Sequence, residues 1–413
     1  MERNKFRARL ILRRALDVGT EERYIVWRMK KISPILRQGL ILSVTLVFFL
    51  RLLHFLAGYS FIIRFNNFPV TKREMDLTEI IYSDKSNKLY TLLQPIDRFD
   101  ALWYKDIVRG GYKNHPLSTA FFPLYPWLVQ GMTSIFKQSY ELWSFILTTV
   151  LTFLVFLLIF IMTYLEYDGD AAKRALLLFA FFPTSFFLLM PYSESLLIFL
   201  ILLTFYLAKK KLFILGVISA SLTVMTKPYG ILAAIPLILY ISKIKALPHK
   251  ILMSFCLLLL PLSFIGIYFY QFQQTAGKYT ILNIHKYWGI ERPYPWQPIL
   301  SLLTRFYQHP FDLPNTANFF LVLGTVFFLI KSYKNIALSY WLFSLFAFLT
   351  FYFSVYRNGI LFSYSRYFLA LFPIFIYYGS KKIKDISLYI YLPIAFSFQM
   401  LFFIFYTFGF FVA

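Results

Sequence analysis

QGLILSVTLVFFLRLLHFLAG, residues 38–58, is an almost unbroken apolar run. Its length is about the 20 residues that an α-helix needs to cross a ~30 Å hydrocarbon core. Two polar side chains interrupt it, Arg51 and His54, which are three residues apart and therefore share a helix face. A charge at bilayer depth costs roughly 2.5–3.5 kcal/mol on insertion scales, so Arg51 should face protein or lipid headgroups. Snorkelling towards the headgroups is the equally acceptable alternative.

The whole chain shares this character. Of 413 residues, 59% are hydrophobic and only 15% charged, whereas soluble domains carry about 25% charged residues. The composition excludes a soluble protein and predicts a multi-pass membrane protein. The net charge of +23 comes mostly from short gaps between apolar runs, which indicates topology signals and anionic-lipid contacts instead of nucleic-acid binding. The single cysteine, Cys256, excludes an intramolecular disulfide and a cysteine metal cluster.

Residues 1–37 form a basic N-terminal segment, with eleven Lys or Arg against four acidic residues. A basic flank of this kind is retained in the cytoplasm. An amphipathic helix on the anionic leaflet and a disordered tail are both compatible with it. The segment lacks an apolar core followed by a small-residue cleavage site, so we do not interpret it as a cleaved signal peptide.

The remaining chain, 38–413, is predicted to be an all-α transmembrane bundle of about eleven spans with the C-terminus outside. After 38–58, the spans are expected near 142–165, 172–190, 192–208, 211–226, 230–242, 251–270, 317–331, 336–354, 367–379 and 386–410. Five short gaps, most of them basic, then fall inside: EYDGDAAKR, AKKK, SKIKALPHK, KSYKN and SKKIKD.

Most of the polar sequence falls in two long loops on the outer side, 59–141 and 271–316. The short, proline-containing stretch 121–136 is predicted to be an interfacial helix, and Lys227-Pro228-Tyr229-Gly230 a break between two spans. A transporter must open to both sides. Polar sequence concentrated on one face is typical of an enzyme that acts on a lipid-linked substrate.

The first loop contains DRFDALWYKDIVRGGYKNHPLSTAFFPLYP, residues 97–126. Asp97 and Asp100 are three apart and would share a face of a short helix. A carboxylate there can serve as a general base that deprotonates an acceptor hydroxyl. Asp106 is a third candidate. Three aromatic side chains could wall a sugar site by stacking: Trp103, Tyr104 and Tyr112. The alternative is that the acids pair with Arg98, Lys105 or Arg109 on a solvated surface.

Three further charges stand at the outer ends of predicted spans. Glu194 is the only acidic residue between Asp170 and Glu291, and Lys227 and Arg366 also have apolar flanks. Two cations and a carboxylate at this level would suit a lipid phosphate and its sugar. Independent snorkelling of the two cations is the alternative.

The sequence carries no motif typical of a metal site or a nucleotide-binding site. The outer histidines, His115, His285 and His309, lack metal-ligand spacing, so no metal site is predicted, although a divalent cation is not excluded. No P-loop or dinucleotide fingerprint is present, and the two long outer loops contain no DxD pair that could hold a metal with a nucleotide sugar. We expect no cofactor, and a sugar donor that a polyprenyl phosphate carries across the bilayer.

Five sequence blocks resemble, in order, motifs of the PIG-V-like mannosyltransferases, a family similar to GT-C glycosyltransferases. The blocks are FDALWYKDIVRGGY, STAFFPLYP, FFPTSFFLLMPYSESL, LTVMTKPYGILAAIPL and SRYFLALFP, spread over residues 97–373. The resemblance implies a GT-C-like fold, a lipid-phosphate mannose donor, transfer with inversion and an active site on the luminal or periplasmic side.

Residue by residue, the family's tryptophan-aspartate pair corresponds to Phe99-Asp100, which makes Asp100 the first candidate for the base. Its YSE motif corresponds to Tyr192, Ser193 and Glu194, and its SRY motif to Ser365, Arg366 and Tyr367. Lys227 stands where the family has arginine, and therefore lacks a bidentate fork.

We therefore predict an integral-membrane mannosyltransferase that transfers a sugar from a polyprenyl-phosphate donor to a glycan or glycolipid acceptor. Asp100, with Asp97 assisting or substituting, would be the base. Lys227, Arg366, Glu194, Tyr192 and His115 would bind the donor phosphate and sugar. Membrane lipids are the other expected partners, and nucleic acid is not. A transporter or flippase of lipid-linked saccharides, and a scaffold subunit of a glycan-assembly complex, remain the alternatives.

Overall fold

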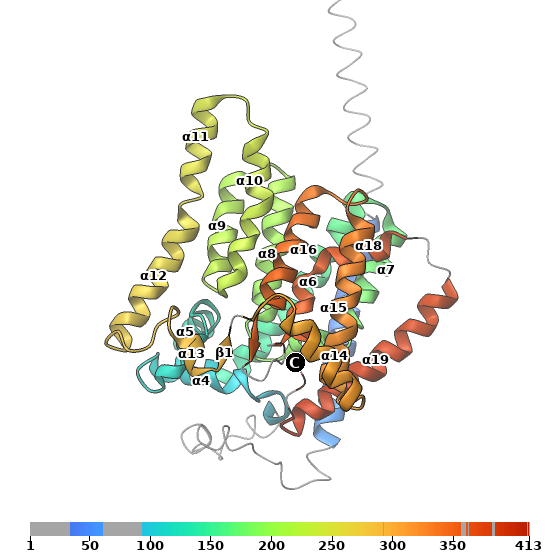
Figure 1. The fold of residues 1–413 in the computed structure, drawn as a ribbon, viewed down its shortest axis with the longest axis horizontal. Helices are drawn as coiled ribbons and strands as arrows, with labels where there is room; N and C mark the ends of the chain where they lie inside the picture. Colours follow the sequence, from blue (N-terminus) through green and yellow to red (C-terminus); the bar gives the residue numbers. More distant parts are fainter. Residues whose placement is uncertain are drawn as a thin grey trace, which may run out of the picture.

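The computed structural model describes residues 34–60, 93–291, 293–356, 361, 363–381, 385–410 and 412. The basic segment up to residue 33 and the part of the first long loop from 61 to 92 lie outside the described residues. The described chain is almost entirely helical (Figure 1), which confirms the all-α class.

The described part of the chain begins with a helix at Pro34–Ser60. The first half continues with η1 (Gln94–Ile96), α4 (Asp100–Gly110), η2 (Pro116–Ala120), α5 (Leu124–Phe136), α6 (Tyr140–Glu166), α7 (Gly169–Ala180), η3 (Ser185–Leu189), α8 (Glu194–Lys209), α9 (Phe213–Val224), η4 (Pro228–Ala234) and α10 (Ile235–Ser242). The second half consists of α11 (Leu247–Cys256), α12 (Leu259–Gln274), α13 (Ile284–Tyr287), β1 (Ile290–Glu291), α14 (Gln297–Gln308), α15 (Leu313–Ser332), α16 (Leu338–Tyr352), β2 (Val355–Tyr356), α17 (Tyr364–Tyr367), η5 (Phe368–Ala370), α18 (Phe372–Ser380) and α19 (Asp385–Thr407).

Several helix starts follow from local sequence. Ser139 caps α6 by accepting a hydrogen bond from the Leu142 amide at 3.4 Å, and Asp168 caps α7 by accepting one from the Ala171 amide at 2.7 Å. Short polar side chains at these positions satisfy amides that lack a partner within the helix. The Asp168 cap places the start of α7 within the predicted gap EYDGDAAKR.

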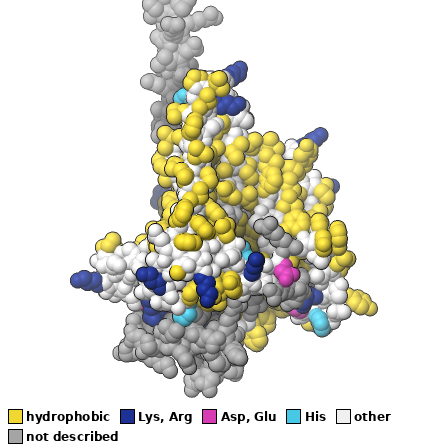
Figure 2. Space-filling view, turned by 60° about the vertical axis from the view of Figure 1, so that its left-hand side comes forward, with side chains coloured by type: hydrophobic (Ala, Val, Ile, Leu, Met, Phe, Trp, Pro, Cys, Tyr) yellow, Lys and Arg dark blue, Asp and Glu magenta, His cyan; other side chains and the backbone are white. Residues whose placement is uncertain are grey.

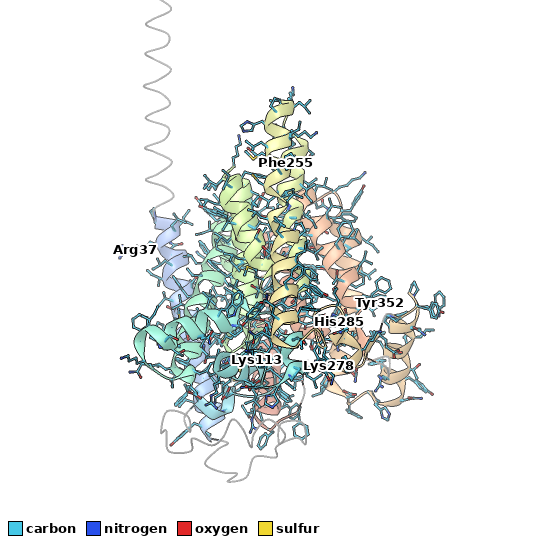
Figure 3. All side chains as sticks on the ribbon, turned by 90° about the vertical axis from the view of Figure 1, so that its left-hand side faces the viewer. Arg37, Lys113, Phe255, Lys278, His285 and Tyr352 are labelled. Carbon is cyan, nitrogen blue, oxygen red and sulfur yellow. The ribbon has the colours of Figure 1, made fainter. Side chains whose placement is uncertain are left out.

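Five helices of the described chain are long and apolar enough to cross a membrane: Pro34–Ser60, Tyr140–Glu166, Leu247–Gln274, Leu313–Ser332 and Ile386–Thr407. Shorter apolar helices lie at Phe213–Val224, Pro228–Ser242 and Leu338–Tyr352. Apolar side chains cover much of the face in Figure 2, with Lys and Arg gathered towards its two ends. In Figure 3, Phe255 lies towards one end, and Lys113, Lys278 and His285 towards the other. This distribution supports a membrane protein.

Predicted spans are not all single helices; 367–379, for example, contains the end of α17, the 3-10 helix η5 and α18. The stretch 172–190 contains α7, which ends at Ala180, and the separate 3-10 helix η3. Pro183 lies between them and cannot continue the α-helical hydrogen bonding. The predicted break at Lys227–Gly230 is confirmed, since α9 ends at Val224 and η4 begins at Pro228.

Arg51 faces protein, as one of the two sequence interpretations required. Its guanidinium donates to the hydroxyls of Thr149 at 3.0 Å and Thr148 at 2.7 Å, and to the carbonyls of Phe145 and Leu189. These partners lie on α6 and at the end of η3. A buried cation is tolerated where its donors are satisfied, so Arg51 ties the N-terminal helix to the centre of the bundle.

In the bundle, α6 packs extensively against both α7 and α8, and α7 packs against α18. The packing of α7 against α18 is close at Gly379: a Cβ added there would lie 2.6 Å from the Cβ and the backbone nitrogen of Ala175. Only glycine fits such an approach of two helix backbones.

We predict that Gly379→Ala destabilises the protein by about 1–3 kcal/mol, because it forces α7 and α18 apart. Thermal unfolding of the purified protein in detergent measures the change. Gly324→Ala in α15 is the matched control, since nothing lies within 4 Å of its added Cβ. Equal melting temperatures of the two variants would contradict the packing argument.

Candidate functional site

The first long loop places the carboxylate of Asp100 at the start of helix α4. Helix α4 begins at Asp100, after Phe99 with a φ of 48°. A positive φ is strained for a phenylalanine. Asp97 therefore lies before the helix, and the expectation that Asp97 and Asp100 share a helix face is wrong: the turn at Phe99 separates them.

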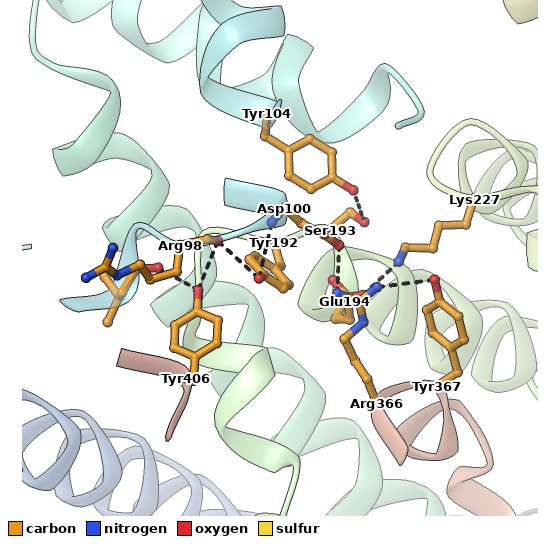
Figure 4. A network of polar contacts seen from close by, with 11 residues as sticks. Arg98, Asp100, Tyr104, Tyr192, Ser193, Glu194, Lys227, Arg366, Tyr367 and Tyr406 are labelled. Atoms are coloured by element: carbon orange, nitrogen blue, oxygen red, sulfur yellow. Dashed lines mark hydrogen bonds and ion pairs between the residues drawn. The ribbon is translucent and has the colours of Figure 1, made fainter. Parts of the chain in front are cut away.

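Four charged residues from distant segments form one network (Figure 4). Arg366 Nη1 donates to Asp100 Oδ2 at 2.6 Å, and Arg366 Nε lies 3.2 Å from Glu194 Oε1. Lys227 Nζ donates to the same Glu194 oxygen at 2.7 Å. The predicted alternative of independently snorkelling cations does not describe this arrangement, since both cations contact one carboxylate.

Glu194 is the first residue of α8. Its carboxylate therefore lies at the positive end of the helix dipole, a favourable place for an anion. The side chain is almost fully buried. Oε2 has no hydrogen-bond partner in the described part of the chain, so both charged contacts converge on Oε1.

Lys227 lies in the break between α9 and η4. The break is compact because Gly230 approaches the preceding helix: a Cβ at this position would lie 2.2 Å from the Thr223 carbonyl oxygen. The Gly230 amide also donates to the Lys227 carbonyl at 2.9 Å. Proline after the lysine and glycine three residues on thus fix the backbone that carries the ammonium group.

Arg366 lies on α17, a single helical turn held from two sides. The Ser365 amide donates to Asn318 Oδ1 at 3.0 Å, and Thr184 Oγ1 donates to the Ser365 carbonyl at 2.8 Å. The antiparallel pair β1–β2 also joins Glu291 of the second long loop to Val355, upstream of α17. The polar contacts fix the arginine within an apolar interior.

Tyrosines surround the network. Arg366 Nη2 donates to the Tyr367 hydroxyl at 3.2 Å, and Lys227 Nζ lies 4.7 Å from the centre of the Tyr367 ring. The Tyr104 hydroxyl donates to Ser193 Oγ at 2.6 Å. Burial, together with the negative charges of Glu194 and Asp100, raises the pKa of Tyr104 well above its ordinary value. Its hydroxyl stays a neutral donor.

Tyr192 orients the start of α4. Its hydroxyl donates to the Arg98 carbonyl at 3.1 Å and accepts from the Asp100 amide at 3.3 Å. The Tyr406 hydroxyl lies 3.2 Å from the same carbonyl. Two tyrosines, one in the turn before α8 and one on α19, thus hold the backbone around the strained Phe99.

The two ends of the network differ in exposure. The side chains of Asp100 and Lys227 are 16% and 11% exposed, whereas those of Arg366 and Glu194 are 3% exposed. Arg366 and Glu194 therefore form the buried centre, and Asp100 and Lys227 form the accessible edge. A substrate that reached this site would contact the carboxylate and the ammonium first.

Asp97 belongs to a second network. Lys105 Nζ lies 2.9 Å from Asp97 Oδ2 and 2.6 Å from Glu141 Oε1, and all three side chains are buried. Burial lowers the pKa of Lys105, but the two carboxylates outweigh it and leave the pKa raised. The predicted pairing of Asp97 with Lys105 is present, though not on a solvated surface. Asp97 and Asp100 are thus held by different cations.

The other predicted site residues lie farther along α4 or in the segment that follows it. His115 Nδ1 is 2.9 Å from Asp106 Oδ2. Trp103 stacks on Phe121, and the Tyr112 hydroxyl donates to the Phe121 carbonyl at 2.6 Å. Of the three predicted wall residues, Tyr104 lies beside the charged network, whereas Trp103 and Tyr112 are buried in an aromatic cluster.

Sequence reasoning missed Glu141 and Tyr406. Glu141, an acidic residue at the start of an apolar span, could have been recognised by its position. Tyr406 had no signal, because it is one of 31 tyrosines in the chain and reaches the loop only through the fold. Among the described residues, no three His, Cys, Asp or Glu side chains group as metal ligands.

Comparison with known proteins found no protein-family match, no similar curated protein and no similar solved structure.

We predict that Glu194→Gln destabilises the protein by about 3–5 kcal/mol, because two buried cations lose their shared anion. Thermal unfolding in detergent measures the loss. Asp170→Asn is the control: Asp170 pairs with Lys173 at 3.4 Å on the surface, and such a pair contributes at most about 1 kcal/mol. If both variants melted at the same temperature as the parent, the four-residue network would make no measurable contribution to stability.

Proposed function

We propose that this chain is an integral-membrane glycosyltransferase that transfers mannose from a polyprenyl-phosphate donor to the hydroxyl of a glycan or glycolipid. The observation that carries the proposal is the convergence of four charged residues. Asp100, Glu194, Lys227 and Arg366 come from four separate sequence blocks, and each block resembles a motif of the PIG-V-like mannosyltransferases.

In the proposed reaction, Asp100 takes the proton of the acceptor hydroxyl while its oxygen attacks the anomeric carbon of the donor. The bond between that carbon and the phosphate oxygen breaks, and the phosphate leaves with the electron pair. One displacement inverts the anomeric configuration. Arg366 binds Asp100 through Oδ2, an arrangement in which Oδ1 accepts the proton.

Lys227 is the better placed cation for the donor phosphate. In the described chain, its one hydrogen-bond acceptor is Glu194, and an ammonium group has three N–H donors. Arg366, by contrast, already contacts Asp100, Glu194 and Tyr367. We assign Lys227 to the leaving phosphate, and Arg366 to the orientation of both carboxylates and to stabilisation of the negative charge that develops.

We also propose how the chain is oriented in the membrane. The N-terminus is cytoplasmic, the chain crosses the membrane about eleven times, and the loops 59–141 and 271–316 lie on the extracytoplasmic or luminal side. The basic short gaps support this orientation. The donor lipid then reaches the site from the bilayer, and no nucleotide is needed.

Asp100→Asn is expected to lower sugar transfer by about 100- to 10,000-fold, the range for loss of a general base. The assay follows mannose transfer from polyprenyl-phosphate mannose by the purified protein in lipid. Asp97→Asn is the comparison variant, because Asp97 is an acid of the same loop that pairs with Lys105 instead of Arg366. Full turnover by Asp100→Asn would overturn the assignment. If the parent protein bound the donor but transferred no sugar, a scaffold subunit would be favoured. If it moved the donor across the bilayer, a flippase would be favoured.

Lys227→Met is expected to raise the donor KM roughly ten- to a hundredfold, since a charge-assisted hydrogen bond is worth about 1.5–3 kcal/mol. Lys227→Arg should restore most of the affinity. Lys210→Met, at an exposed position after α8, is the control for the loss of one charge. An unchanged KM in Lys227→Met would remove this residue from the donor site.

A further inference from the structure

The exposed surface of α14 (Gln297–Gln308) in the second long loop is divided lengthwise. Four large apolar residues lie on one stripe at helical spacing: Trp296, Leu300, Leu303 and Tyr307. Their exposed fractions range from 46% to 89%. The neighbouring stripe is polar and consists of Gln297, Ser301, Thr304 and Gln308. Positions three and four apart lie on the same side of a helix, so each set is continuous.

The third side of α14 is packed against protein. Pro298 and Leu302 are buried, and the Phe306 ring stacks on that of Phe319 in α15 with centroids 5.1 Å apart. This side therefore supplies the packing of α14 against the rest of the protein. The apolar stripe is additional to it, and without a covering partner it would leave a large hydrophobic surface in water.

We infer that α14 is an interfacial helix whose stripe, Trp296 to Tyr307, lies in the headgroup and upper acyl region of the lipid bilayer. Its partner helix α15 is a candidate membrane span with apolar side chains exposed along it, including Phe320, Leu323 and Phe327. The stripe thus continues a lipid-facing surface. A helix of 12 residues is only about 18 Å long and cannot itself cross the hydrocarbon core.

The composition of the stripe fits this partner. Tryptophan and tyrosine, at its two ends, prefer the membrane interface because their rings are apolar and carry one polar group. Phe311, just after the helix, is 92% exposed. The polar stripe beside it then faces water and headgroups, the arrangement typical of helices that lie flat on a bilayer. Figure 1 places α14 at the end of the bundle where α4 and α5 also lie.

The test uses the full chain with Cys256→Ser, which removes its single cysteine. Leu303→Cys and Thr304→Cys, adjacent residues on the two stripes, are each labelled with an environment-sensitive fluorophore. The proteins are placed in phosphatidylcholine nanodiscs, which expose both membrane faces. Lipids carrying a spin label near the top of the acyl chain are one quencher, and aqueous iodide is the other.

We expect lipid quenching at residue 303 to exceed that at 304 by about twofold or more, and iodide quenching to show the reverse order. Equal iodide quenching at both residues would overturn the inference, because the stripe would then lie in water. Protection of residue 303 from both quenchers would also overturn it, since the stripe would then be covered by protein. Neither result bears on sugar transfer, so this test is independent of the proposed activity.

Discussion

The site depends on one carboxylate oxygen. Glu194 Oε1 contacts Lys227 and Arg366, and Arg366 in turn contacts Asp100. In an apolar interior an isolated charge is very costly, so each of these residues requires the others. This mutual dependence links four segments of the chain: the start of α4, the start of α8, the break after α9, and α17. It explains why a bundle with so few charged residues places four of them together.

Helix α4 is fixed by two charged networks, not one. Asp97 and Lys105 connect it to Glu141 at the start of α6, while Asp100 connects it to Arg366 on α17. Tyr192 and Tyr406 hold the intervening Arg98 carbonyl. The strained φ of Phe99 persists because contacts on both sides determine the backbone. An acid in such a turn is oriented before any substrate arrives, as the proposed role of Asp100 as a general base requires.

The helices could be predicted from the sequence because apolar length is a local property. Pro34–Ser60 and Tyr140–Glu166 lie close to the predicted spans, and the break at Lys227 was visible as proline and glycine. The single span predicted over 172–190 is wrong because Pro183 cannot continue the α-helical hydrogen bonding between α7 and η3. The presence of Glu194, Lys227 and Arg366 near the outer ends of spans was also predictable. Their pairing was not, since 33 residues separate Lys227 from Glu194 and 266 separate Arg366 from Asp100. The two acids of the first loop looked equivalent for the same reason: local spacing does not reveal which distant cation each one meets.

Under the proposed function, the charge balance of the network constrains how a lipid-phosphate donor can bind. Two cations and two carboxylates sum to zero, so the resting site does not attract a phosphate by net charge. An incoming phosphate must instead take up the unused N–H groups of Lys227, at the accessible edge, and share that cation with Glu194. Each hydrogen bond from a charged donor is worth about 1.5–3 kcal/mol, so a single lysine supplies orientation more than affinity. The polyprenyl chain is already in the bilayer and gains no transfer free energy from water on binding, but it confines the donor to the membrane and so raises its concentration near the site. The lipid chain thus localises the donor, and the cation needs only to position and stabilise the leaving phosphate. A lysine in place of a bidentate arginine is consistent with these separate roles.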